Sequence, residues 1–165
     1  MKSGLRVATI GLIAVAATSC SAPPPTVPPP QALVKEIVDG DTIVVASGHR
    51  TEIVRLIGID TPEVAHHGQP GECFGPEAAA HLASLAPVGS VVVLSVDREA
   101  RDIYGRLLAY VQTATVPDVA LQLARDGMAE ALAIEPNLST ADPVAAAVAE
   151  ARRAGLGQWG SCPDG

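Results

Sequence analysis

The chain has 165 residues, of which 48% are hydrophobic and only 2% are aromatic, and its formal net charge is −7. This length suits one domain with short appendages, and the scarcity of aromatic residues means that the core must consist of Val, Ile, Leu and Ala. The negative charge excludes a broad basic surface of the kind that binds nucleic acid, so a bound polyanion has to meet a small positive site.

Residues 1–19 are expected to be an export signal of the lipoprotein type. Lys2 and Arg6 precede an apolar run at 7–17 that is too short to span a bilayer as a helix. Small residues then lead to Cys20, an arrangement that resembles the lipobox of bacterial lipoproteins, in which this cysteine receives the lipid. We therefore expect a protein anchored to the cell membrane and facing outward. A secretory signal that leaves a soluble, secreted product is the alternative.

Residues 20–31 contain two runs of three prolines and are expected to form an extended tether, so that the folded domain occupies residues 32–165. If Cys20 is lipidated, Cys73 and Cys162 remain. Two thiols in an oxidising compartment can pair, and this bridge would join the loop before the first helix to the C-terminal tail. Two unpaired thiols are the alternative.

Apolar runs separated by turn residues predict five strands, at 34–38, 42–46, 51–59, 90–96 and 107–112. Helices are expected at 76–85 and 117–125, and a last helix, capped by Asp142, is expected to end near residue 154. Strands followed by helices predict the α+β class. Five short strands suit a small, partly open β-barrel of the oligonucleotide/oligosaccharide-binding (OB) type.

The segment 39–42 (Asp-Gly-Asp-Thr) lies between the first two predicted strands. Asp41 would begin the second strand, where its carboxylate is a candidate ligand for Ca²⁺. One carboxylate cannot fill the shell of this ion, which takes about six to eight oxygens, so further ligands must come from elsewhere in the chain. An ordinary Asp-Gly hairpin turn is the alternative.

The segment 60–63 (Asp-Thr-Pro-Glu) ends the third predicted strand and could supply those ligands. Asp60 would be a second carboxylate, Thr61 would offer its carbonyl, and Glu63 would project on the far side of the turn. A plain turn before proline is the alternative. His66 and His67 follow in the same loop, where we expect solvated side chains rather than a transition-metal site.

Two arginines are candidates for binding a phosphate. Arg55 lies inside the third predicted strand, where it is costly to bury without a partner. Arg106 follows Tyr104 and Gly105 just before the fifth strand. A guanidinium can donate two parallel hydrogen bonds to phosphate oxygens, which favours a phosphate site over ordinary surface positions for these arginines.

The order of these segments, with Phe-Gly-Pro-Glu-Ala at 74–78 and Tyr-Gly-Arg-x-Leu-Ala-Tyr at 104–110, resembles the staphylococcal nuclease (thermonuclease) family. The resemblance runs from about Val34 to Trp159. It implies an OB barrel with three helices and Ca²⁺-dependent hydrolysis of DNA or RNA that leaves 3′-phosphate ends. The resemblance also implies three kinds of site residue: Ca²⁺ ligands (Asp41, Asp60 and the carbonyl of Thr61), catalytic groups (Arg55, Glu63 and Arg106) and a contact to the terminal phosphate (Tyr104).

The chain departs from the family pattern where the family binds a base. A lysine before the phosphate-contacting tyrosine is replaced by Ile103, and two tyrosines that flank the base are replaced by Leu132 and Ile134. Base stacking on an aromatic ring is worth about 1–3 kcal/mol, so we expect catalysis to survive better than affinity. A non-catalytic OB module that binds an oligonucleotide or a protein partner at the cell envelope is therefore the alternative function. Nothing in the sequence demands a dimer, and a monomer is expected.

Overall fold

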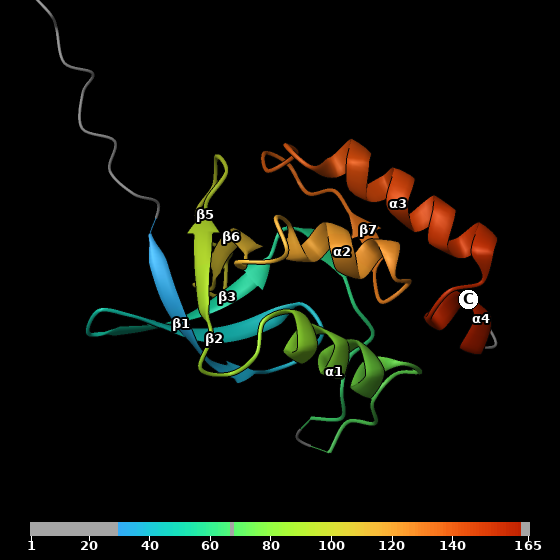
Figure 1. Cartoon of the computed structure of the whole chain (residues 1–165), viewed down its shortest axis with the longest axis horizontal. Helices are drawn as coiled ribbons and strands as arrows, with labels where there is room; N and C mark the ends of the chain where they lie inside the picture. Colours follow the sequence, from blue (N-terminus) through green and yellow to red (C-terminus); the bar gives the residue numbers. More distant parts are fainter. Residues whose placement is uncertain (1–29, 67, 163–165) are drawn as a thin grey trace, which may run out of the picture.

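The computed structural model describes residues 30–66 and 68–162, and Figure 1 shows the arrangement of their elements. The strands are β1 (Gln31–Ile37), β2 (Thr42–Ser47), β3 (Arg50–Leu56), β4 (Gly58–Asp60), β5 (Val91–Ser95), β6 (Leu107–Gln112) and β7 (Glu130–Leu132). The helices are α1 (Gly75–Leu85), α2 (Val119–Arg125), α3 (Ala141–Ala154) and α4 (Gln158–Ser161). The expected export signal, Cys20, the tether before Pro30, and His67 lie outside the described residues.

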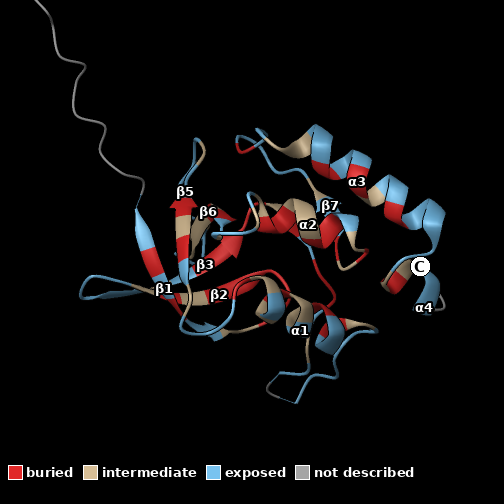
Figure 2. Cartoon of the chain, viewed as in Figure 1, coloured by how far each residue is buried: buried red, intermediate tan, exposed pale blue. Residues whose placement is uncertain are grey.

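Five strands close into a barrel in the order β1-β2-β3-β6-β5. Neighbouring strands are antiparallel, except that β3 and β6 run parallel, and β1 pairs with β5 to complete the barrel. Alternate side chains of the strands point inward, so that Val34, Ile43, Val45 and Val54 are fully buried. Figure 2 shows the buried stretches of the strands in red. The predicted α+β class and the five-stranded OB barrel are confirmed.

Helices α1, α2 and α3 lie to one side of the barrel, as Figure 1 shows. Helix α2 packs against β6, α1 and α3, and its buried face includes Val119 and Leu123. Asp118 begins this helix, because its side chain accepts a hydrogen bond of 3.0 Å from the amide of Leu121. None of the helices in the described part of the chain is long and apolar enough to cross a membrane.

The strand predicted at 51–59 is in fact divided into β3 and β4. The chain bends at Ile57, and Gly58 has a φ of 93°, which glycine adopts without strain. Beyond this bend, β4 leaves the barrel and pairs with β7 in a separate two-stranded sheet. Neither short strand is long enough to show the alternation of apolar and polar residues by which strands are predicted.

Two element ends also differ from the sequence prediction. Strand β1 begins at Gln31, three residues before its predicted start. Gln31 is the last residue of the predicted tether. Helix α3 begins at Ala141 with Thr140 as its N-cap, so the prediction that Asp142 caps the helix is wrong. The amide of Val144 donates to the carbonyl of Thr140, which places Asp142 in the first helical turn, where a carboxylate still favours the helix dipole.

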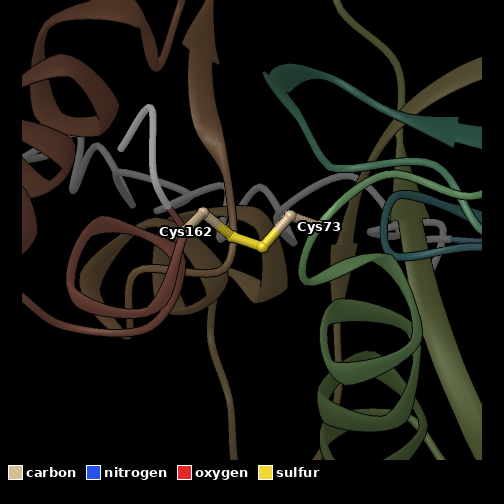
Figure 3. The surroundings of a disulfide bond; sticks show 2 residues. All are labelled: Cys73 and Cys162. Atoms are coloured by element: carbon tan, nitrogen blue, oxygen red, sulfur yellow. A yellow bond between two sulfur atoms is a disulfide. The ribbon is translucent and has the colours of Figure 1, made fainter.

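Cys73 and Cys162, for which the cysteine count predicts a bridge, are bonded to each other (Figure 3). Their Cα atoms are 6.0 Å apart, and 89 residues separate them in the sequence. Cys73 lies two residues before α1, and Cys162 follows α4 directly. The disulfide therefore joins the end of the long loop after β4 to the C-terminal end of the described chain.

Candidate active site

Arg55 is the centre of the site, and the barrel itself positions it. It lies on β3 between Thr42 of β2 and Leu108 of β6, and it is only 9% exposed. Its Nη1 donates to the carbonyls of Leu56 and Ile59, at 2.9 and 2.8 Å. Because β3 ends at Leu56 and β4 contains Ile59, these two bonds hold the bend between the strands. A buried guanidinium requires such partners, and they fix its orientation.

The other terminal nitrogen of Arg55 meets two carboxylates. Nη2 lies 2.9 Å from Oδ2 of Asp41 and 2.7 Å from Oδ1 of Asp60. The side chain of Asp41 is buried, whereas that of Asp60 is 58% exposed. The two carboxylates that the sequence singles out as metal ligands are thus brought together across one guanidinium, although Asp41 and Asp60 are 19 positions apart in the sequence.

Asp41 is held from several sides. Its Oδ1 accepts a hydrogen bond of 3.0 Å from the hydroxyl of Thr42, and its Oδ2 accepts one of 3.0 Å from the amide of Thr61. Burial raises the pKa of Asp41 to about 7, since its loss of hydration outweighs the opposing effects of Arg55 and of these hydrogen bonds. The charge of Asp39 adds to the increase.

Gly40 allows this arrangement because it has no side chain. A Cβ atom at Gly40 would lie 2.7 Å from Oγ1 of Thr61 and 2.8 Å from Cβ of Ala78 in α1. The turn between β1 and β2 therefore packs directly against Thr61 and the helix. The Asp-Gly pair is a turn, as the sequence indicates. Gly40 is required there because a side chain would clash with Thr61 and Ala78.

Asp39 is a site residue that sequence reasoning treated only as part of a turn. It is 7% exposed, and its Oδ1 accepts a hydrogen bond of 3.1 Å from the amide of Asp41. One oxygen of Asp39, one of Glu63 and a ring nitrogen of His66 lie within 4.8 Å of one another. The sequence signal for this residue is the Asp-x-Asp pair at 39 and 41, in which both aspartates are buried. His66 is exposed, as expected for a histidine of this loop, and it also lies beside the carboxylates of Asp39 and Glu63.

Glu63 is exposed and lies at the start of the loop that leads to α1. Partial loss of hydration raises the pKa of its carboxyl, and the carboxylates of Asp39, Asp60 and Glu72 raise it further, while Arg55 acts in the opposite direction. Glu63 therefore belongs to the same electrostatic cluster as Asp60 and Asp39. A carboxyl with a raised pKa is a better proton acceptor than an ordinary one.

Arg106 is held by a tight turn rather than by the barrel. Asp102 accepts hydrogen bonds from the amides of Tyr104 and Arg106, and its Oδ2 lies 2.6 Å from Nε of Arg106. Gly105 has a φ of 82°, which completes the turn. The guanidinium lies 5.6 Å from the centre of the Tyr104 ring, and this ring is 78% exposed. Arg106 and Tyr104 therefore present one charged and one aromatic group to solvent together.

The two arginines line one cavity, of about 400 Å³, although Arg55 lies on β3 and Arg106 lies on the turn before β6. Tyr104 also lines it, and the rest of its wall is largely aliphatic: Ile103, Leu108, Leu132 and Ile134. Asp41, Asp60 and Glu63 do not line this cavity, so the candidate carboxylates and the two arginines do not all surround a single cavity. The carboxylate cluster and the cavity are neighbours that share Arg55.

These observations describe an OB-barrel protein with a carboxylate cluster and two arginines beside one cavity. Residues 53–161 match the family described as "Staphylococcal nuclease homologue". The chain is 37% identical to a thermonuclease of Staphylococcus intermedius over 127 residues, which are 77% of this chain and 74% of that protein. The chain belongs to the staphylococcal nuclease family.

Two further relatives show how widely the domain is used. A thermonuclease of Staphylococcus hyicus is 31% identical over 126 residues, covering 76% of this chain and 73% of that protein. Endonuclease YhcR of Bacillus subtilis is 33% identical over 146 residues, which are 84% of this chain but only 12% of that much longer protein. The same domain thus makes up most of some relatives and a small part of others.

Proposed function

We propose that this protein is a Ca²⁺-dependent nuclease that hydrolyses phosphodiester bonds of DNA or RNA and leaves 3′-phosphate ends. The observation that carries the proposal is that Arg55 and Arg106 line one cavity while Arg55 also contacts the carboxylates of Asp41 and Asp60. Thermonuclease and endonuclease relatives support the nuclease activity. The preference between DNA and RNA is left open by this proposal.

The arginines would bind and stabilise the phosphate. Hydrogen bonds from Arg55 and Arg106 would become stronger as negative charge builds on the phosphate oxygens in the transition state. Among the described residues, Leu56, Ile59, Asp41 and Asp60 occupy both terminal nitrogens of Arg55. To donate two parallel hydrogen bonds to a phosphate, Arg55 would use Nη2 and Nε. Nη2 must first release one of its two carboxylates, whereas Nε has no protein partner among the described residues.

Glu63 would act as the general base. It would take a proton from water, whose oxygen would bond to phosphorus while the bond from phosphorus to the 5′ oxygen breaks. The phosphate would then remain on the 3′ side. The raised pKa of Glu63 suits this role, because a carboxylate whose pKa lies above its ordinary value accepts a proton more readily.

The carboxylate cluster fits a hard cation. The cluster contains four carboxylates that lie close together: Asp39, Asp41, Asp60 and Glu63. Arg55 contacts two of them, Asp41 and Asp60. Burial and neighbouring carboxylates raise the pKa values of Asp41 and Glu63. Asp41, Asp60 and the carbonyl of Thr61 would hold Ca²⁺ through oxygen ligands, which this ion prefers. When bound, the ion would lower the energy of the charged transition state and orient water.

The test is to incubate the oxidised protein with single-stranded DNA and RNA, with Ca²⁺ and with excess chelator, and to map the ends of the products. Cleavage that needs Ca²⁺ and leaves 3′-phosphates supports the proposal. Binding without cleavage would support the second candidate, a non-catalytic OB module for an oligonucleotide or a protein partner. The aliphatic wall at Leu132 and Ile134 and the net charge of −7 favour the form of that candidate that binds a protein partner, because both features weaken nucleic-acid binding.

We also propose that the protein works outside the cytoplasm, as a monomer held to the cell membrane through lipidated Cys20 or secreted. The disulfide between Cys73 and Cys162 supports export, because disulfides persist mainly in oxidising compartments. Mass spectrometry of the N-terminal peptide from cells distinguishes the two routes. A peptide that begins at acylated Cys20 supports the anchor, and an unmodified peptide supports secretion.

A further inference from the structure

The loop that begins at Glu63 is closed at its base by a second glutamate. Oε2 of Glu72 accepts a hydrogen bond of 3.0 Å from the amide of Glu63, and the amide of Glu72 donates one of 2.8 Å to the carbonyl of Glu63. Both backbone groups of Glu63 are therefore paired with one residue nine positions further along the chain. Such reciprocal pairing fixes the backbone, and it limits the directions in which the Glu63 side chain can point.

The carbonyl of Glu63 also packs directly against the beginning of α1. A Cβ atom added to Gly75, the first residue of α1, would lie 2.2 Å from that carbonyl oxygen. One added to Gly71 would lie 2.8 Å from the amide of Ala65. Only glycine fits at both places, because the end of the loop packs against the backbone of its first residues, 63–65.

The disulfide fixes the end of this loop. Cys73 follows Glu72 in the sequence, and its bond to Cys162 joins it to the segment after α4 (Figure 3). That segment is itself anchored: the amide of Cys162 donates to Gln158, and the amide of Gln158 donates to the carbonyl of Gly127, at 3.0 Å. A Cβ at Gly157 would lie 2.3 Å from this carbonyl, so the residue before α4 is in close contact with the turn that follows α2. The bridge thus ties Glu72 to a well-packed part of the fold.

We propose that Glu72 is a positioning residue for Glu63, and that the Cys73–Cys162 disulfide keeps Glu72 in place, so that full activity requires the oxidised protein. The inference rests on the proposed nuclease function and on the role of Glu63 in it. Glu72 acts through the hydrogen bond to the Glu63 amide, and the bridge limits the movement of the loop end that carries Glu72. Neither residue needs to touch the substrate.

The experiment compares kcat and KM for single-stranded DNA, at saturating Ca²⁺, in wild type, Glu72→Ala, Glu72→Gln and the double variant Cys73→Ser/Cys162→Ser. We expect kcat to fall about tenfold or more in Glu72→Ala, with KM nearly unchanged, because small displacements of a catalytic group are costly. Glu72→Gln keeps an acceptor oxygen and should recover most of the loss. The variant without the bridge should lose kcat in the same direction as Glu72→Ala.

Two controls separate positioning from a general loss of stability. In a Glu63→Gln background, Glu72→Ala should cause no further loss of kcat, since a residue that acts only through Glu63 cannot contribute once Glu63 is removed. The exposed Glu77 in the first turn of α1 is the matched carboxylate, and Glu77→Ala should leave kcat unchanged. An unchanged kcat in Glu72→Ala, or an additive loss in the Glu63→Gln background, would overturn the proposal.

Amide hydrogen exchange gives a readout that does not depend on catalysis. The amide of Glu63 should exchange slowly in wild type and in Glu72→Gln, and faster in Glu72→Ala and in the reduced protein. If wild type shows no cleavage but this pattern of exchange holds, the nuclease proposal fails, whereas the proposal that Glu72 and the disulfide hold Glu63 in place is supported. If cleavage occurs and exchange at Glu63 is the same in all variants, the positioning proposal fails alone.

Discussion

The two arginines at the candidate site line the same cavity, but the chain holds them in different ways. Arg55 comes from a central strand of the barrel, is 9% exposed, and contacts two carbonyls and two carboxylates. Arg106 follows an exposed turn, and its one carboxylate partner is Asp102. Residues with the same proposed chemical role can therefore differ in what they contribute to the fold. Substitutions at Arg55 should affect both folding and catalysis, whereas those at Arg106 should affect mainly catalysis.

The largest effect is expected for Arg55→Ala. Loss of this guanidinium leaves Asp41 buried without its cationic partner and removes the two bonds that hold the bend at Ile57. We expect kcat to fall by about a thousandfold or more, and the free energy of unfolding to fall by about 3 kcal/mol. Steady-state kinetics and denaturant titration measure the two losses.

The matched control for Arg55 is Arg50, an exposed arginine at the start of the same strand. Arg50→Ala should leave kcat unchanged and have little effect on stability, because exposed charges contribute little. If Arg55→Ala were as stable as wild type, the contrast between a barrel-held and a turn-held arginine would be wrong.

Arg106→Ala should give the next largest effect, and it should be confined to catalysis. We expect kcat to fall by about a hundredfold to a thousandfold, as is usual when one donor to a transition-state oxyanion is lost. Asp102 keeps its hydrogen bonds from the amides of Tyr104 and residue 106, so the turn should persist. The melting temperature should therefore remain close to that of wild type. A large drop in melting temperature would show that Arg106 is as important to the fold as Arg55.

The carboxylate half of the site should make stability depend on pH when no metal is present. Burial raises the pKa of Asp41 from 3.8 to about 7 in the folded chain, so the folded state binds a proton that the unfolded state has lost between these values. The contribution of Asp41 to stability is then favourable at low pH and is lost as the pH rises toward 7. In Asp41→Asn this dependence should disappear. The stability of the variant relative to wild type should therefore be greater at pH 8 than at pH 5.

Thermal unfolding in chelator at pH 5 and pH 8 measures this gain, which should be about 1–3 kcal/mol, since each unit of pKa corresponds to about 1.4 kcal/mol. Asp142→Asn, at an exposed carboxylate in the first turn of α3, is the control for the substitution itself. An equal shift at both pH values would contradict the assignment of the raised pKa to Asp41. Added Ca²⁺ should reverse the order, because wild type keeps the charged ligand.

Local patterns in the sequence predicted the strands of the barrel, and the family resemblance predicted that they form an OB barrel. Alternating apolar residues and turn signals predicted the five barrel strands, and the helices predicted at 76–85 and 117–125 have ends close to those of α1 and α2. The small sheet of β4 and β7 was missed because pairing between distant segments, rather than local pattern, makes a three-residue strand. The cap of α3 was missed by two residues because Thr140 and Asp142 are both good capping types.

The site was predictable in its residue types but not in its burial. Ile53 and Arg55 share one side of a regular strand, yet Ile53 is 48% exposed and Arg55 is buried, because the chain bends after Leu56 and covers the second residue. The same bend brings Asp60 back to Arg55. Asp39 is predicted only as a turn residue, because the Asp-x-Asp spacing marks two acidic residues but does not show that the first carboxylate turns inward. Long-range packing decides all three of these features.

The smallest expected effect concerns the aliphatic wall of the cavity that the two arginines share. Ile134 lines this cavity and is 62% exposed, so a larger ring fits there without repacking the core. Ile134→Tyr should lower the dissociation constant for a single-stranded oligonucleotide about tenfold, because one base can then stack on the ring. Val88→Tyr is the matched control, since Val88 is 61% exposed and does not line the cavity. Equal binding by the two variants would mean that the base lies elsewhere, and that the arginines, rather than the aliphatic wall, determine how this chain binds its substrate.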